Sequence, residues 1–250
     1  MRVLGVIPAR LGSVRLPRKP LLPIAGRPLI EWVWRRMHEL VVLDQLVVAT
    51  DAEEVVEAVE GFGGRAVMTR TDHASGTDRI AEVAGREEFA GYDRVVNLQG
   101  DEPFLPAAAA AGAVDQLEVG WDVGTAAVPF ASRDEWQAPS TVKVVRGDDG
   151  GALYFSRAPI PYDRDGEGLT GGGAPLKHVG IYAFDRGALL EATALPEHPL
   201  ERRERLEQLR WLAAGLRIGV ALVEGGGPGI DTEDDLARAE AILGGRLELT

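Results

Sequence analysis

A loop near the N-terminus carries several cationic side chains and no acidic ones. It runs from Pro8 to Leu21 and includes Arg10, Arg15 and Lys19 among small residues and prolines. Arginine binds phosphate oxygens in pairs and lysine supplies a compact charge, so this loop is suited to hold a triphosphate. Its spacing is not that of a Walker P-loop. The alternative is an exposed basic loop without a ligand.

Two acidic motifs lie far apart in the sequence. The first is NLQGDEP at 97–103, which contains Asp101, and the second is GIDTEDDL at 229–236, which contains Asp231. Carboxylates are the hard oxygen ligands that Mg²⁺ prefers, so Asp101 and Glu102 of the first motif are candidate metal ligands. The alternative for this motif is an acidic turn that ends a strand. In the second motif, Asp231 or Thr232 could cap the last helix.

A third polar motif, DHASGTDR at 72–79, precedes a predicted helix. Its hydroxyl groups can cap that helix or hydrogen-bond a ligand, and Thr77 is the residue we expect to act as the cap.

Strand-like and helix-like runs alternate around these motifs, which predicts a doubly wound α/β fold with a mostly parallel sheet. In such sheets ligands bind beyond the carboxyl ends of the strands, where the motifs lie. The predicted strands are 3–7, 46–49, 66–68, 95–98, 123–130, 141–146, 152–156, 179–184 and 217–223. The predicted helices are 28–40, 52–59, 77–84, 200–214 and 232–243. The glycine-rich turn at 147–151 predicts a hairpin.

Composition narrows the class of protein. The 250 residues are 45% hydrophobic and 26% charged, which is typical of a globular protein, and predict one domain over 1–250 with an inserted subregion at roughly 130–200. A net charge of −12 argues against a nucleic-acid partner. There is no cysteine, and no apolar run approaches the roughly 20 residues that span a bilayer. We therefore expect a cytoplasmic protein without a membrane partner.

Eight blocks of sequence, in order, resemble those of the sugar-acid cytidylyltransferases. They are ARLGSVRLPRKPL at 9–21, VATD at 48–51, MTRTDHASGTDR at 68–79, NLQGDEP at 97–103, ALYFSRAPIPYDR at 152–164, KHVGIYAF at 177–184, LEQLR at 206–210 and GIDTEDDL at 229–236. The resemblance implies a nucleotide-diphospho-sugar transferase-like fold and a homodimer formed through the central hairpin region. The sequence departs from the family at Val14, where a small hydroxyl residue is usual, and at Arg18, where glycine is usual.

The resemblance also implies an activity, the transfer of CMP from CTP to 3-deoxy-D-manno-octulosonate (Kdo), with release of pyrophosphate, for lipopolysaccharide biosynthesis. It assigns Mg²⁺ to Asp101 and Asp231, and makes these two residues catalytic together with Arg10 and Lys19. The residues implied in nucleotide binding are Arg10, Ser13, Arg15, Lys19, Arg70, Ser75, Thr77, Arg79 and Gln99.

A sugar acid requires one cation for its carboxylate and several groups that donate and accept hydrogen bonds for its hydroxyls. The resemblance assigns this role to Arg157, His178, Tyr182, Glu207 and Gln208. From the residues alone, His178 also fits a strand edge, Tyr182 a core aromatic, and the last two an exposed helix face. Alternative functions are cytidylyl transfer to amino-Kdo or a sialic-acid-like sugar, glycosyl transfer, and nucleotide-sugar binding without catalysis.

Overall fold

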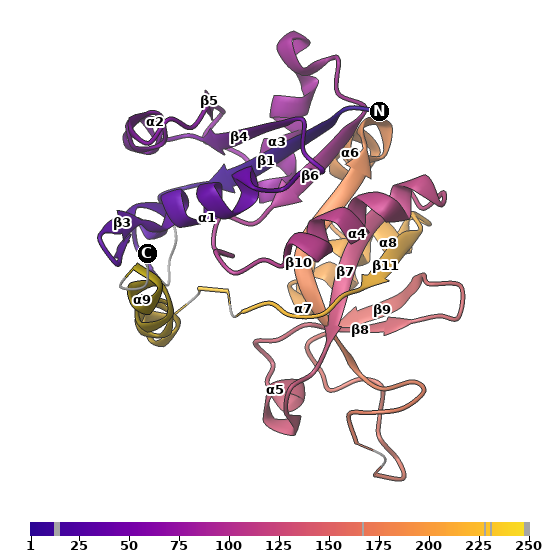
Figure 1. Ribbon diagram of the computed structural model, residues 1–250. Helices are drawn as coiled ribbons and strands as arrows, with labels where there is room; N and C mark the ends of the chain where they lie inside the picture. The colour runs from indigo at the N-terminus through magenta and orange to yellow at the C-terminus, as the bar shows by residue number, and fades with distance from the viewer. Residues whose placement is uncertain (13–15, 167, 228, 231, 248–250) are drawn as a thin grey trace. The chain divides into compact units, whose positions relative to one another are not determined.

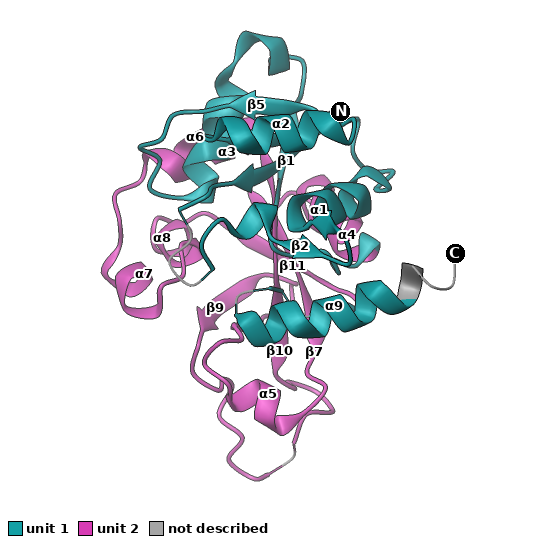
Figure 2. Ribbon diagram, turned by 90° about the vertical axis from the view of Figure 1, so that its left-hand side faces the viewer, with its two compact units in different colours: residues 1–107, 226–250 teal, residues 108–225 magenta. Residues whose placement is uncertain are grey.

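The protein is described here by a computed structural model that covers residues 1–12, 16–166, 168–227, 229–230 and 232–247. The chain forms two compact units (Figure 2), one of residues 1–107 with 226–250 and the other of residues 108–225. We call them unit 1 and unit 2. The predictions of a single domain over 1–250 and of an inserted subregion at roughly 130–200 stay predictions.

Unit 1 is built on a parallel sheet in which β1 (Val3–Ala9) is central (Figure 1). β1 pairs with β4 (Gln45–Thr50) on one side and with β6 (Arg94–Leu98) on the other, and β4 pairs with β5 (Ala66–Met68). β6 is buried throughout, and β1 nearly so, which explains why their sequences are continuous apolar runs rather than alternating ones. All four predicted strands of this part of the chain are confirmed.

Helices connect these strands as crossovers. They are α1 (Leu29–His38), α2 (Glu53–Gly61) and α3 (Gly76–Gly85), with the 3₁₀ turns η1 (Lys19–Leu21) and η2 (Glu87–Phe89). A short hairpin of β2 (Pro23–Ile24) and β3 (Arg27–Pro28) precedes α1. The C-terminal helix α9 (Glu233–Leu247) belongs to the same unit, where Glu240 Oε2 accepts a hydrogen bond of 2.8 Å from the Ala25 amide.

Ser75, and not Thr77, caps α3. Its hydroxyl accepts a hydrogen bond of 3.0 Å from the Asp78 amide, and the Asp78 carboxylate accepts one of 3.0 Å from the Ser75 amide. This reciprocal pair is a capping box, which satisfies two amides at the helix start. Thr77 lies inside the first turn and is buried. The prediction of Thr77 as the cap was wrong because both residues precede the apolar run and both could cap it.

Unit 2 contains a mostly antiparallel group of strands. β7 (Val123–Pro129) pairs in parallel with β11 (Ile218–Leu222) and antiparallel with β10 (Leu176–Asp185). β10 pairs in turn with β8 (Lys143–Arg146), which forms an antiparallel pair with β9 (Ala152–Ser156). The Gly147 amide donates 2.8 Å to the Gly151 carbonyl across the turn, so the predicted hairpin is confirmed.

The helices of unit 2 differ more from the prediction. α4 (Ala107–Glu118), α5 (Arg133–Gln137) and α6 (Arg186–Ala194) were not predicted. The single helix expected over 200–214 is two, α7 (Pro199–Glu204) and α8 (Gln208–Ala213). They are separated at Arg205, which has a left-handed φ of 54°. No glycine or proline marks that break, so the residue types gave no sign of it.

Throughout the described part of the chain, every helix is too short or too polar to cross a bilayer.

Candidate active site

A cavity of about 380 Å³ opens in unit 1 beyond the carboxyl ends of β1 and β6. It is lined by Pro8, Ala9, Arg10, Gly12, Lys19, Pro20, His73, Ser75, Gly76, Arg79, Gln99, Gly100 and Asp101. The cavity therefore joins the basic loop, the segment before α3 and the first acidic motif. This is the position that an open α/β sheet offers to a ligand.

Gly100 allows the two strand ends to approach each other. A Cβ atom at this position would lie 2.8 Å from the Pro8 carbonyl oxygen, which is too close for any other residue without a backbone shift. The glycine in the motif is thus required by the backbone that forms the floor of the cavity.

The basic loop and the first acidic motif meet through Lys19 and Asp101. Lys19 Nζ donates a hydrogen bond of 2.6 Å to Asp101 Oδ2, and their side chains are 12% and 34% exposed. A carboxylate and an ammonium group placed side by side in a cavity can act on a ligand that carries both phosphates and a cation. These two predicted residues are brought together by the fold.

Arg18 shapes the chain just before Lys19. It has a left-handed φ of 58°, a conformation that favours glycine, which explains why glycine is usual here in the family that the sequence resembles. Its guanidinium pairs with the Glu54 carboxylate at the start of α2, with an Nη1–Oε1 distance of 3.1 Å. That hydrogen bond raises the pKa of Arg18 and lowers the pKa of Glu54, so both stay charged.

The second acidic motif contacts the first through a backbone hydrogen bond. The Ile230 amide donates a hydrogen bond of 2.9 Å to the Asp101 carbonyl oxygen. Asp231 itself lies outside the described residues, as do Ser13 and Arg15. Among the residues that the structure describes, no group of three or more histidine, aspartate or glutamate side chains is arranged to hold a metal ion. The predicted magnesium site thus stays a prediction.

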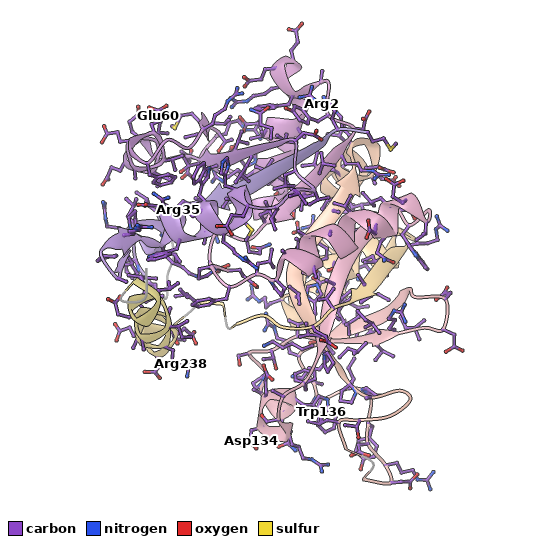
Figure 3. All side chains as sticks on the ribbon, viewed as in Figure 1. Arg2, Arg35, Glu60, Asp134, Trp136 and Arg238 are labelled. Carbon is purple, nitrogen blue, oxygen red and sulfur yellow. The ribbon has the colours of Figure 1, made fainter. Side chains whose placement is uncertain are left out.

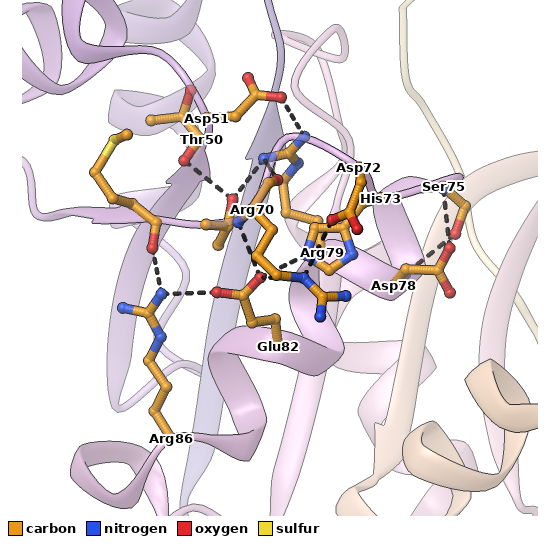
Figure 4. Close-up of polar contacts among 12 residues, drawn as sticks. Thr50, Asp51, Arg70, Asp72, His73, Ser75, Asp78, Arg79, Glu82 and Arg86 are labelled. Atoms are coloured by element: carbon orange, nitrogen blue, oxygen red, sulfur yellow. Dashed lines mark hydrogen bonds and ion pairs between the residues drawn. The ribbon is translucent and has the colours of Figure 1, made fainter.

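Arg79 lines the cavity but is held by protein groups (Figure 4). It is 3% exposed, donates 2.7 Å to Asp51 Oδ2, and also donates to the Thr69 hydroxyl. This ion pair connects the end of β4 to α3. Arg70 lies at the surface with its side chain 69% exposed and pairs with Asp72 at 3.2 Å. Of the residues predicted to bind the nucleotide, Arg70 and Thr77 are not among those that line the cavity.

Two residues in this region were not predicted from the sequence. His73 lines the cavity, and its Nε2 lies 2.6 Å from Glu82 Oε2 on α3 (Figure 4). Burial alone would raise the pKa of Glu82, but hydrogen bonds from the Arg70 amide, His73 and Arg86 outweigh it and lower the pKa to about 2. The separation of nine residues between His73 and Glu82 gave no signal, because their contact depends on how the segment before the helix folds back.

The residues predicted to bind the sugar all lie in unit 2. His178 and Tyr182 share β10, with ring centroids 5.3 Å apart, and Phe155 packs edge-on against the histidine. His178 Nε2 lies 2.9 Å from the Thr125 hydroxyl. The enclosed ring cannot readily take up a charge, so burial lowers the pKa of His178 to about 3, although part of the residue reaches solvent. Burial, together with Glu207, raises the pKa of Tyr182 well above its usual value.

Arg157 is fixed by its neighbours in the same unit. Its backbone amide donates 2.9 Å to Glu204 Oε2, its Nε donates 2.8 Å to the Glu204 carbonyl, and its Nη1 donates 3.1 Å to the Pro139 carbonyl. Fully buried Lys143 donates to three carbonyls, including that of Arg157 at 2.8 Å. Burial and the charge of Arg157 lower the pKa of Lys143.

Glu207 and Gln208 lie at the start of α8. Arg210 Nη2 lies 3.4 Å from Glu207 Oε1 and 2.7 Å from Glu201 Oε1. Gln208 is 4% exposed. From the sequence, both residues could also have lain on an exposed helix face. That alternative is wrong for Gln208.

Side chains over the whole molecule are drawn in Figure 3, where Trp136 and Asp134 of α5 lie at one end of unit 2. Trp136 is 5% exposed, and its Nε1 donates 3.3 Å to the Ile160 carbonyl. This contact holds α5 against the segment that follows Arg157.

The chain is similar to known proteins over nearly its full length. The family model described as Cytidylyltransferase matches residues 4–218. The chain is 55% identical over 242 residues to the 3-deoxy-manno-octulosonate cytidylyltransferase of Gemmatimonas aurantiaca, covering 96% of this chain and 93% of the relative. It is 48% identical over 246 residues to the enzyme of that name from Acidobacterium capsulatum, covering 97% of each.

A solved structure of CMP:2-keto-3-deoxy-manno-octonic acid synthetase complexed with CTP is also similar. It is 42% identical and superposes with a TM-score of 0.90, covering 98% of this chain and 100% of the other. The predicted mostly parallel α/β fold of nucleotide-diphospho-sugar transferase type is thereby confirmed. With these matches over nearly the full length, the chain belongs to the cytidylyltransferase family.

Proposed function

We propose that this chain transfers CMP from CTP to Kdo, giving CMP-Kdo and pyrophosphate. The observation that carries the proposal is the Lys19–Asp101 pair in a cavity beyond the carboxyl ends of β1 and β6. The full-length similarity to relatives of that name supports the choice of nucleotide and sugar.

The reaction exchanges one bond at phosphorus. The anomeric hydroxyl oxygen of Kdo bonds to the α-phosphorus of CTP, while the bond from that phosphorus to the bridging oxygen of pyrophosphate breaks. The hydroxyl proton is released to solvent. Such reactions are catalysed mainly by positioning the reactants and stabilising the phosphate charge.

The cations of the basic loop act on the phosphates. Arg10 and Lys19 line the cavity, and both side chains can bind phosphate oxygens and stabilise the negative charge of departing pyrophosphate. Lys19 would exchange part of its contact with Asp101 for a phosphate oxygen when CTP binds. Ser13 and Arg15 belong to the same loop by sequence and are proposed to add phosphate contacts.

Mg²⁺ is the proposed cofactor, held by Asp101 and Asp231. The donor set fits, because two carboxylates are hard oxygen ligands and the Ile230 amide hydrogen-bonds the Asp101 backbone. A bound Mg²⁺ would lower the pKa of the sugar hydroxyl and offset charge on the phosphates. Lys19, at 2.6 Å from Asp101, keeps that carboxylate in position.

Arg157, His178, Tyr182, Glu207 and Gln208 are the proposed sugar ligands. Arg157 supplies the cation for the sugar carboxylate, and its guanidinium is oriented by the carbonyls of Glu204 and Pro139. Neutral His178 can accept a hydrogen bond from a sugar hydroxyl or donate one to it, without the cost of burying a charge.

We further propose that the enzyme works as a homodimer in the cytoplasm, supplies CMP-Kdo for lipopolysaccharide biosynthesis, and needs neither a nucleic acid nor a membrane as partner. The acidic net charge of −12 supports the absence of a nucleic-acid partner.

The decisive assay measures pyrophosphate release from CTP, Mg²⁺ and Kdo, with UTP, ATP and GTP as competing nucleotides. We expect release that requires both CTP and Kdo, with no acceptor glycan present. Parallel reactions with amino-Kdo and a sialic acid identify the sugar. Faster release with either of those sugars than with Kdo would overturn the choice of substrate, and no release with any sugar would overturn catalysis.

A further inference from the structure

One carboxylate on α3 holds the segment that precedes the helix. Glu82 Oε2 accepts a hydrogen bond of 3.0 Å from the Arg70 amide and lies 2.6 Å from His73 Nε2. Glu82 Oε1 accepts one of 2.9 Å from Arg86 Nη2, and that same nitrogen donates to the Met68 carbonyl. Figure 4 shows these contacts converging on Glu82. Segment 68–73 is thereby fastened to α3 at three points.

The contact with His73 reaches the nucleotide cavity. His73 lines the cavity with Lys19 and Asp101, yet its side chain is only 5% exposed. A ring enclosed to this degree and hydrogen-bonded at one nitrogen has little freedom to rotate. Its orientation is therefore set by Glu82.

The contact also decides which ring nitrogen carries the proton. Glu82 is ionised over the working pH range, since its pKa is about 2, and a carboxylate can only accept hydrogen bonds. The proton of the neutral imidazole must then lie on Nε2, which leaves Nδ1 as an acceptor. The second nitrogen lies on the side of the ring away from Glu82 (Figure 4).

We propose that Glu82 is a positioning residue of the nucleotide cavity, which holds His73 so that Nδ1 accepts a hydrogen bond from a donor group of the bound nucleotide. This inference rests on the proposed use of CTP. Two donor groups of CTP have the required chemistry, the amino group of cytosine and the hydroxyls of ribose. Uracil presents a carbonyl oxygen in place of the amino group, so an acceptor at that position would disfavour UTP.

The first test reads the tautomer directly by NMR of ¹⁵N-labelled protein at mildly alkaline pH. The chain has four histidines, so the ring signals of His73 are assigned by their loss in His73→Asn. We expect protonated Nε2 and unprotonated Nδ1, with the Nδ1 shift moving when CTP is added. A proton on Nδ1, or no response to CTP, would overturn the inference. This arm reads the tautomer in the unmodified protein, and the variant serves only to assign the ring signals.

The second test separates positioning from structure by kinetics. In Glu82→Gln the amide can donate to Nε2, which favours the opposite tautomer with a proton on Nδ1. We expect KM for CTP to rise about tenfold, which corresponds to about 1.4 kcal/mol, while kcat and KM for Kdo change less than twofold. The matched control is Glu88→Gln, because Glu88 also pairs with an arginine, Arg65, but is 46% exposed on the side chain.

Nucleotide analogues then identify the donor. If the base amino group is the partner, Glu82→Gln narrows the preference for CTP over UTP while 2′-deoxy-CTP and CTP lose affinity equally. If the ribose 2′-hydroxyl is the partner, 2′-deoxy-CTP is insensitive to the substitution, and if the 3′-hydroxyl is the partner, 3′-deoxy-CTP is insensitive instead. A Glu82→Gln enzyme with unchanged KM for CTP and unchanged preference would contradict the proposal. An unmodified protein without turnover of CTP would instead contradict the proposed function.

Discussion

Lys19 Nζ lies 2.6 Å from Asp101 Oδ2, which joins two motifs that are 82 residues apart in the sequence. The pair brings the cations proposed to bind phosphate and the carboxylate proposed to bind the metal to one cavity. Because Asp101 is the only member of the proposed metal pair that the structure describes, its substitution is the most direct test of the site.

Asp101→Asn removes the negative charge but keeps the side-chain volume. We expect kcat to fall by more than about a hundredfold, because even groups that only support a metal ligand change activity by 10- to 100-fold. The thermal midpoint should stay within a few degrees, since the asparagine oxygen can still accept from Lys19. Pyrophosphate release is measured as a function of Mg²⁺ concentration. The control is Asp115→Asn on the exposed face of α4, and near-native kcat of Asp101→Asn at saturating Mg²⁺ would refute the assignment.

Arg157→Lys tests the orientation of the proposed sugar-carboxylate ligand. Lysine keeps the charge but cannot reproduce the planar set of donors that contacts the carbonyls of Glu204 and Pro139. We expect KM for Kdo to rise about tenfold, or about 1.4 kcal/mol, with KM for CTP unchanged. Steady-state kinetics are measured with each substrate varied in turn. A general loss of folding would instead lower kcat, whichever substrate is varied. Unchanged KM for Kdo would remove Arg157 from the sugar site.

His178 should remain neutral through the working pH range. Its pKa is about 3 and that of an unfolded histidine is about 6.5, so the folded protein favours the neutral ring. The stability contributed by this group is complete above pH 6.5 and is lost as the pH falls toward 3. We expect its ring signals to show no titration between about pH 5 and 8, whereas the signals of an exposed histidine titrate near 6.5. A midpoint near 6.5 for His178 would contradict its burial.

The lowered pKa of Glu82 predicts a separate loss of folding stability in acid. Its pKa falls from 4.5 to about 2 on folding, so its contribution is complete above pH 4.5 and disappears as the pH falls through about 2. The unfolding free energy of the unmodified protein should therefore drop more steeply over this window than that of Glu82→Gln. Urea unfolding at a series of pH values measures both slopes, with Glu88→Gln as control. Parallel slopes for the unmodified protein and Glu82→Gln would show that Glu82 has no such role.

The strands of unit 1 and the motifs at their ends could be predicted from the sequence, because buried parallel strands are continuous apolar runs and ligands of such sheets bind beyond the strand ends. The choice of Ser75 over Thr77 as cap could not be made, since both are hydroxyl residues within two positions. The contact of His73 with Glu82 was equally hidden. It depends on the path of the backbone between them, which no local pattern encodes.

The break between α7 and α8 has a consequence for the proposed sugar ligand. In an uninterrupted helix the carbonyls of Glu204 and Arg205 would accept from amides four residues further on. Because the helix stops there, both carbonyls instead accept from the Arg157 guanidinium, at 2.8 and 3.5 Å. In a redesigned chain with one continuous helix over 200–214, these two carbonyl oxygens would thus accept from backbone amides of the helix. The Arg157 side chain would then lose both partners and turn toward solvent.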